Sequence, residues 1–188
     1  MNQDISSILI SEAEIDRITT RIAAEIDRDY RDSAASGKKL LLLCILKGSV
    51  VFMGDLMKKI TLPVEIDFMK VSSYGAGTSS TGQVNILLDL HRSDLPDVDF
   101  IVVEDIIDSG RTLSYLIEYL RLKGAHSVKT CTLLDKPERR EAGLRDFHPD
   151  YVGCSIPDQF VVGYGLDFNE QYRALPYVGV LKPEIYSN

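Results

Sequence analysis

Four isoleucines recur with helical spacing near the start of the chain: Ile15, Ile18, Ile22 and Ile26. Ser11 precedes them, and Glu14 follows Ser11 by three residues, which is the pattern of a capping box at a helix start. Ser36 and Gly37 then interrupt the apolar repeat. The pattern predicts an amphipathic helix over residues 12–31 that packs one apolar face on a core.

Apolar runs of strand length follow this helix, and segments with helical spacing separate several of them. Strands are predicted over residues 40–46, 64–71, 84–90, 100–104, 127–134, 151–155 and 177–181. Helices are predicted over residues 50–60 and 112–123, with Gly124 placed to end the second. Strands that alternate with helices favour βαβ units, so the predicted class is α/β with a mainly parallel central sheet flanked by helices.

The segment over residues 72–82 reads SSYGAGTSSTG and has no periodicity. Its eleven residues include three glycines and six serines or threonines. A polar segment of this length between two strands is typical of a flexible connector or of a lid over an active site. Composition alone favours neither interpretation.

The length and charge of the chain limit the classes of protein to which it can belong. Its 188 residues, 45% hydrophobic and 26% charged, predict a single globular domain over residues 1–188. A formal net charge of -7 argues against binding to a nucleic acid, which requires a basic surface. No run reaches the roughly 18 apolar residues of a membrane-spanning helix, so no membrane partner is expected.

The cysteines and the N-terminus indicate a cytoplasmic protein. Cys44, Cys131 and Cys154 are an odd number of well-spaced thiols, and two of them lie within apolar runs, which favours buried reduced side chains. The first ten residues lack the basic region and the long apolar region of a signal peptide. The three histidines have no spacing typical of a zinc site and are interpreted as surface residues.

The segment from Val102 to Leu113, VVEDIIDSGRTL, carries the strongest functional signal. Glu104 and Asp105 come where the predicted strand ends, and a short loop with Gly and hydroxyl residues leads into a helix. The free N–H groups at a helix start bind anions such as phosphate. Two carboxylates beside a phosphate fit a ligand that also carries hydroxyls and a metal ion, as a ribose phosphate does. The segment matches neither a Walker A loop nor a dinucleotide fingerprint.

This segment resembles the phosphoribosyl pyrophosphate signature of the type I phosphoribosyltransferases. Lys136 and the segment FVVGYGLDFNEQYR, from Phe160 to Arg173, resemble the purine-site elements of the hypoxanthine-guanine members of bacterial type. Together with the segment around Lys47, the similarity covers nearly the whole chain. It implies the type I phosphoribosyltransferase fold with a small hood subdomain, contributed by the N- and C-terminal segments. It also implies an enzyme of purine salvage that forms IMP or GMP plus pyrophosphate.

The resemblance implies which residues bind the phosphoribosyl group: Glu104, Asp105, Asp108, Ser109, Gly110, Arg111 and Thr112. Glu104 and Asp105 would bind the ribose hydroxyls, directly or through water on Mg²⁺. The loop over residues 108–112 would hold the 5′-phosphate, with Arg111 acting through its amide more than its side chain. Asp108 is the candidate general base, or proton relay, at purine N7. Its alternative is an ordinary helix cap or Asx turn.

The resemblance also implies the purine-binding residues: Lys136, Phe160, Val161 and Asp167. Lys136 only donates hydrogen bonds, so it suits a purine O6 and leaves the amino group of adenine without a partner. Phe160 would stack on the purine, and Val161 would bind the ring edge through its backbone. Without the resemblance, Lys136 would be interpreted as a surface lysine and Phe160 as a core residue.

Three further expectations rest on the resemblance. Lys47, Gly48 and Arg173 form the pyrophosphate site, and the Leu46–Lys47 peptide bond is cis. Mg²⁺ is the cofactor, with Asp167 as its ligand and Glu104 and Asp105 beside it. Residues 72–82 form a lid over the site, with Ser73 and Tyr74 at its working part.

The partners implied are phosphoribosyl pyrophosphate, a 6-oxopurine base and further copies of the chain in a homodimer or homotetramer. A relative that prefers xanthine or is specific for adenine is the first alternative. The second is a regulator that keeps the phosphoribosyl pyrophosphate fold and binds nucleic acid. The net charge of -7 and the presence of Asp108 and Lys136 disfavour the regulator.

Overall fold

A six-stranded sheet forms the centre of the computed structural model, which describes residues 2–73 and 84–187. Its strands are β2 (Lys39–Ile45), β3 (Val64–Ser73), β4 (Val84–Leu88), β5 (Val98–Ile107), β6 (Ser127–Asp135) and β7 (Tyr151–Ser155). Across the sheet the order is β4-β3-β2-β5-β6-β7, and β3–β4 is the antiparallel pair among otherwise parallel neighbours. The predicted α/β class with a mainly parallel sheet is confirmed.

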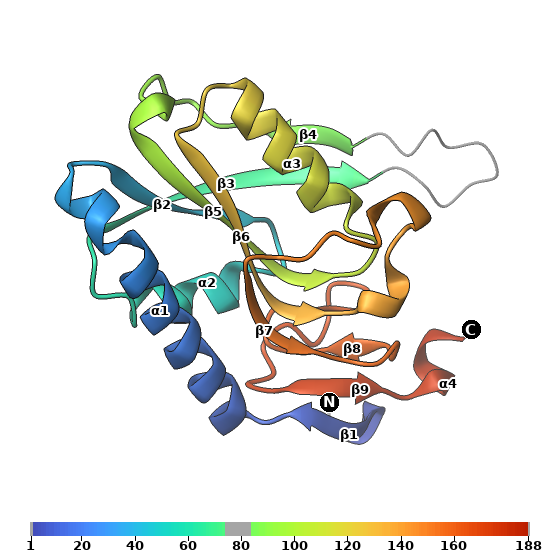
Figure 1. Ribbon diagram of the computed structural model, residues 1–188. Coiled ribbons are helices and arrows are strands. Elements are labelled where there is room, and N and C mark those ends of the chain that lie inside the picture. The colour runs from blue at the N-terminus through green and yellow to red at the C-terminus, as the bar shows by residue number, and fades with distance from the viewer. Residues whose placement is uncertain (1, 74–83, 188) are drawn as a thin grey trace.

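Helices cover both faces of this sheet (Figure 1). α1 (Glu12–Ala35) and α2 (Val50–Met57) lie on one face, and α3 (Arg111–Leu122) lies on the other. Successive side chains of β2 alternate between the two layers: Leu40, Leu42 and Cys44 join α1 and α2, whereas Leu41, Leu43 and Ile45 join α3. This burial on both faces explains why the strand reads as a continuous apolar run.

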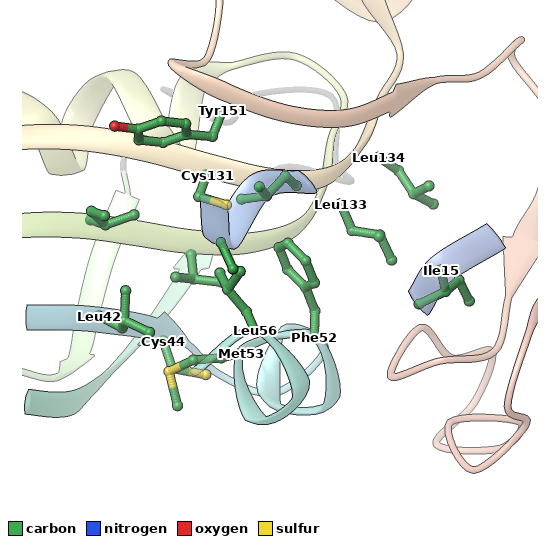
Figure 2. Close-up of a cluster of buried hydrophobic side chains, with 14 of the residues drawn as sticks. Ile15, Leu42, Cys44, Phe52, Met53, Leu56, Cys131, Leu133, Leu134 and Tyr151 are labelled. Atoms are coloured by element: carbon green, nitrogen blue, oxygen red, sulfur yellow. The ribbon is translucent and has the colours of Figure 1, made fainter. Parts of the chain in front are cut away.

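The core on the side of α1 and α2 is built from large side chains that interlock between the layers (Figure 2). Phe52 and Leu56 of α2 are fully buried, and they gather with Leu42 and Cys44 of β2. Each such side chain contributes about 1.5–3 kcal/mol by leaving water. The predicted capping box is present at the start of α1, where Ser11 and Glu14 cap each other's backbone.

A second, three-stranded sheet joins the two ends of the chain. β9 (Val178–Leu181) runs antiparallel between β1 (Ile5–Ile10) and β8 (Val161–Val162). The N-terminus and the short helix α4 (Pro183–Tyr186) lie beside this sheet (Figure 1). The sequence predicted β9 but neither of its neighbours, because β8 is only two residues long and β1 has little alternation of burial.

The structure corrects two element boundaries that bear on the site. β5 ends at Ile107, so Glu104 and Asp105 lie inside the strand and not at its end. The strand continues because Ile106 and Ile107 still pair with β6, at Leu134 and Asp135. α2 ends at Met57 rather than at residue 60.

Several smaller expectations are confirmed. The Leu46–Lys47 peptide bond is cis. The three cysteines are free, and two of them, Cys44 and Cys131, are fully buried. Gly124 follows α3 with a φ of 93°, in the left-handed conformation that ends helices. Among the described residues, no helix is long and apolar enough to cross a membrane.

Candidate functional site

Two neighbouring cavities open near the carboxyl ends of the parallel strands β5 and β6, where ligands of such sheets bind. The first, here called the loop cavity, has a volume of about 560 Å³ and is lined by Glu104 and by Asp108, Ser109, Gly110 and Thr112 of the loop before α3. The second, here called the aromatic cavity, has a volume of about 450 Å³ and contains Lys136, Phe160, Val161 and Asp167. Ile106, Asp108 and Arg139 line both cavities. The two groups of predicted residues therefore meet at Asp108.

The loop cavity ends at the N-terminus of α3. Gly110 caps this helix in the left-handed conformation, with a φ of 82°, and a Cβ there would lie 3.3 Å from the Arg140 and Phe147 side chains. No side chain caps the helix, although the Arg111 amide donates to Ser109 Oγ at 3.3 Å. The helix start therefore offers backbone N–H groups to an anion.

The side chain of Arg111 is not part of the cradle. Its guanidinium pairs with Glu141, and 41% of the side chain is exposed. The Glu141 amide in turn donates to the Ser109 carbonyl at 3.2 Å, which ties the loop to the segment after β6. The role expected for the Arg111 amide stays a prediction.

Of these two neighbours in β5, Glu104 lines the loop cavity and Asp105 lines neither of the two cavities. The alternation of faces is irregular next to them. Val103 and Ile106 both pack on the side of α1 and α2, although a regular strand would send them to opposite faces. Asp105 lies against Gly48, where a Cβ would come within 1.5 Å of Asp105 Oδ2. Burial and the neighbouring negative charge raise the pKa of Glu104 well above its usual value, and burial also raises the pKa of Asp105.

The aromatic cavity combines one buried cation with stacked rings. Only 9% of the Lys136 side chain is exposed, and Nζ lies 3.8 Å from Asp108 Oδ1 and 3.7 Å from Asp158 Oδ1. The Phe160 ring stacks on Tyr186 of α4, with centroids 4.7 Å apart, and meets Phe168 edge-on. The cavity thus offers a charged donor and an aromatic surface, which suits a planar ligand with an acceptor oxygen.

A third group of predicted residues surrounds one carboxylate. Lys47 Nζ lies 2.9 Å from Glu170 Oε1, and Arg173 Nη2 lies 3.2 Å from Glu170 Oε2. Arg173 also pairs with Asp167 at 2.8 Å and donates to the Gly165 carbonyl at 2.8 Å. Close packing holds this group together, because a Cβ on Gly165 would lie 2.0 Å from the Gly48 carbonyl oxygen.

The lid prediction cannot be followed in the structure. Ser73 is the last residue of β3, and its side chain lies outside the described part of the chain. Tyr74 and the rest of the predicted lid, up to residue 82, also lie outside the described residues.

The residues that contact the predicted ones and were missed include Arg140, Asp158, Glu170 and Tyr186. Asp158 and Glu170 lie in or beside the segment that carries the purine resemblance, so their acidic character beside Phe160 and Arg173 was a usable signal. Arg140 and Tyr186 gave no local signal, because their partners are brought to them only by the fold.

Comparisons with known proteins agree over the whole chain. A family model described as the phosphoribosyl transferase domain matches residues 5–169. A hypoxanthine-guanine phosphoribosyltransferase of Staphylococcus aureus is 47% identical, and the match covers 100% of both chains. The bifunctional protein TilS/HprT of Listeria innocua is 49% identical over 100% of this chain, which spans 28% of that protein.

Solved structures give the same result. The crystal structure of a hypoxanthine phosphoribosyltransferase from Staphylococcus aureus superposes with a TM-score of 0.90 at 47% identity, over 100% of this chain and 97% of that one. A mutant hypoxanthine phosphoribosyltransferase from Trypanosoma cruzi, in a ternary complex with substrates, superposes with a TM-score of 0.87 at 38% identity. That match covers 98% of this chain and 99% of the other.

Proposed function

Because this chain belongs to the phosphoribosyltransferase family, we propose that it transfers the phosphoribosyl group of phosphoribosyl pyrophosphate to hypoxanthine or guanine. The products are IMP or GMP and pyrophosphate, and the reaction serves purine salvage. The names of its relatives support this choice of base. The observation that carries the proposal is the junction of the loop cavity with the aromatic cavity at Asp108.

The bond that forms joins a purine nitrogen to ribose C1, so base and sugar must meet between the cavities. A 5′-phosphate at the start of α3 receives N–H groups and the positive end of the helix dipole. The ribose then extends toward Glu104, which lines the same cavity and accepts hydrogen bonds from its hydroxyls. The negative charge of Glu104 and Asp105 also favours the cationic character that the ribose acquires as pyrophosphate leaves.

The base lies in the aromatic cavity between Phe160 and the shared residue Ile106. Lys136 donates to O6, and the backbone of Val161, at the start of β8, contacts the ring edge. Asp108 takes the proton from N7 as the glycosidic bond forms, which avoids a cationic product. Its carboxylate lies near the Lys136 ammonium, so proton acceptance and O6 recognition occur within one small region.

The carboxylates present fit a magnesium ion that enters with the substrate. The described residues include no group of three or more metal-ligating side chains, so the protein does not form a complete cage. Magnesium keeps several waters and commonly uses one or two carboxylates with phosphate oxygens. Asp167 would be the protein ligand of the ion, and Glu104 and Asp105 are the other carboxylates of the proposed site that could bind it, directly or through water. The bound ion would neutralise charge on the leaving pyrophosphate.

Lys47 and Arg173 bind the pyrophosphate in this proposal, together with the Gly48 backbone. Both side chains already hold a carboxylate, that of Glu170, so their positions suit a bridging anion. Residues 72–82 act as the lid that excludes water from the reacting sugar. The enzyme acts in the cytoplasm as a homodimer or homotetramer.

Absorbance-monitored turnover tests the proposal. The protein is mixed with Mg²⁺, phosphoribosyl pyrophosphate and each of hypoxanthine, guanine, xanthine and adenine. Turnover of hypoxanthine and guanine but not adenine is expected. The Lys136→Gln variant should lower the ratio of kcat/KM for 6-oxopurines to kcat/KM for adenine. The reason is that the glutamine amide can also accept a hydrogen bond from the amino group of adenine.

The alternatives predict other results. Xanthine as the best substrate, or turnover of adenine alone, would correct the substrate. Folded protein that binds nucleic acid at high salt and turns over no base would make it a regulator instead.

A further inference from the structure

The guanidinium of Arg140 contacts both parts of the proposed site, the phosphate loop and the segment that carries Lys136. Arg140 follows β6, and only 3% of its side chain is exposed. Its Nη2 pairs with Asp135, the last residue of β6, whose side chain is 7% exposed. A buried pair of this kind is costly to desolvate unless further hydrogen bonds satisfy it. The remaining donors of Arg140 therefore need partners.

Those partners are backbone carbonyls of residues that flank or form the proposed site. Nη1 donates to the Asp108 carbonyl at 2.7 Å and lies 3.2 Å from the Ile107 carbonyl and 3.4 Å from the Lys136 carbonyl. Nε lies 3.4 Å from the Phe147 carbonyl. The Lys136 amide also donates to the Ile107 carbonyl at 2.9 Å, so the ends of β5 and β6 are joined directly below the guanidinium.

The stem of Arg140 contacts the phosphate loop as well. A Cβ on Gly110 would lie 3.3 Å from Arg140 Cδ, so the side chain packs against the residue that caps α3. Its neighbour Arg139 differs from it in exposure and in partner, since 55% of the Arg139 side chain is exposed and it pairs with Asp158. The arrangement is therefore particular to Arg140 and is not a general property of this basic segment.

We propose that Arg140 is a positioning residue for the transfer reaction, which fixes Asp108 and Lys136 relative to each other and to the phosphate loop. The inference rests on the proposed function, because that assigns N7 to Asp108 and O6 to Lys136. Their carboxylate and ammonium lie 3.8 Å apart, and purine N7 and O6 lie side by side on one edge of the base. A rigid planar fork that bonds both backbones is suited to holding this spacing, and a lysine cannot replace it.

The kinetic effects expected on loss of Arg140 differ between a purely structural role and a positioning role. If Arg140 only stabilised the fold, its loss would lower the amount of active enzyme and hence Vmax, with unchanged KM values and pH profile. If it positions Asp108 and Lys136, the purine KM and the pH dependence of kcat must change in enzyme that remains folded.

The test uses the double variant Asp135→Asn/Arg140→Met, which leaves no buried charge without a partner and should keep the folded state. Arg145→Met is the matched control, because Arg145 is an exposed arginine on the same connection. Arg140→Lys is the second variant, because it keeps the charge beside Asp135 but loses the fork. Melting temperature, kcat, the KM of each substrate and the pH profile of kcat are measured for each protein.

Both Arg140 variants are expected to lower kcat by about 100-fold, the cost of a small misplacement of reacting groups. The purine KM should rise by about tenfold, as expected for a weakened hydrogen bond from Lys136. The KM for phosphoribosyl pyrophosphate should change less, and Arg145→Met should behave as wild type. Wild-type purine KM and pH profile in either folded Arg140 variant would overturn the inference.

Turnover by the wild-type protein separates this inference from the proposed function. If the wild-type protein turns over no purine, the proposed function fails first. If it does turn purines over, the variants test Arg140 alone.

Discussion

At the scale of residues, the neighbouring acids Glu104 and Asp105 of β5 are in electrostatic conflict with each other and with their surroundings. Both residues are half-buried. Burial raises the pKa values of both carboxyl groups, and the neighbouring negative charge adds to the effect at Glu104. A site that binds a cationic sugar and a metal ion benefits from such charge, although the ligand-free fold is destabilised by it. The conflict makes the stability of the protein dependent on pH.

Glu104→Gln should therefore stabilise the ligand-free, metal-free protein while lowering its activity. The pKa of Glu104 is higher in the folded than in the unfolded state, so its contribution to stability is lost as pH rises through the folded value. Glutamine does not ionise, so the gap in melting temperature between variant and wild type should widen from pH 5 to pH 9. A gap of roughly 2–4 °C corresponds to about 1 kcal/mol at this chain length.

Thermal unfolding across this pH range measures the gap, with Glu118→Gln on the exposed face of α3 as the control. A gap that stays constant with pH would show that Glu104 is not the group responsible.

Glu170 is a second residue of interest at this scale, because its carboxylate pairs with both cationic side chains of the proposed pyrophosphate site, Lys47 and Arg173. In solution it competes with any anion for Lys47 and Arg173. Glu170→Gln should therefore tighten pyrophosphate binding by a few-fold at low salt, with a smaller gain at high salt because screening weakens exposed charge pairs. Calorimetric titration with pyrophosphate measures this, and weaker binding by the variant would mean that Glu170 organises the cations instead of competing for them.

At the scale of elements, the turn between β2 and α2 is fixed by close packing. It carries the cis Leu46–Lys47 bond and then Gly48, which lies between the Asp105 carboxylate and Gly165. The sequence predicted a strand up to residue 46 and a helix from residue 50, and the resemblance assigned Gly48 to the pyrophosphate site. It did not show why a side chain cannot fit at position 48. That reason lies in β5 and in the segment after β8, which approach from distant parts of the chain.

Gly48→Ala should lower activity strongly and destabilise the fold by about 1–3 kcal/mol, as overpacking does. Its Cβ would lie 1.5 Å from Asp105 Oδ2, so the carboxylate or the turn must move. Gly54→Ala in α2 is the matched control, since a Cβ there meets nothing within 4 Å. That change should stabilise the protein by about 0.5–1 kcal/mol. Chemical denaturation and turnover measure both, and equal behaviour of the two variants would contradict the packing argument.

At the scale of the whole molecule, the two sheets divide the proposed site between them. The central sheet supplies Glu104, Asp108 and Lys136, whereas Val161 belongs to the small sheet formed by both ends of the chain. Phe160 comes just before β8 and stacks on Tyr186 of α4. The positions of the residues that line the aromatic cavity therefore depend on strand pairing within the small sheet.

Val180→Pro tests this division, because Val180 pairs with Ser7 on one side and Val161 on the other. Proline removes a backbone donor at the centre of the small sheet. The purine KM should rise more than the KM for phosphoribosyl pyrophosphate, and Val180→Thr, which keeps the backbone N–H, should change neither. Steady-state kinetics with each substrate varied in turn measure this. Equal effects on both constants would mean that the sheets do not act separately.

The sequence by itself determined the α/β class, the order of most elements and the residues of the loop at α3. These features are local, because apolar periodicity, a capping box and a contiguous strand–loop–helix motif are expressed within short segments. Asp108 and Lys136 were assigned through the resemblance, and their positions after β5 and β6 place them at one edge of a parallel sheet. Even so, the sequence-based prediction ended β5 at residue 104, and so placed its two acids at the end of the strand rather than inside it.

Only the tertiary structure decided how these residues are held. The bond between Lys47 and Glu170 joins residues 123 positions apart, and that between Arg140 and Asp108 joins residues 32 apart. The irregular alternation between Val103 and Ile106 and the small sheet also depend on packing between distant segments. No periodicity encodes such contacts, because each depends on where other elements pack and on which buried donors still lack partners.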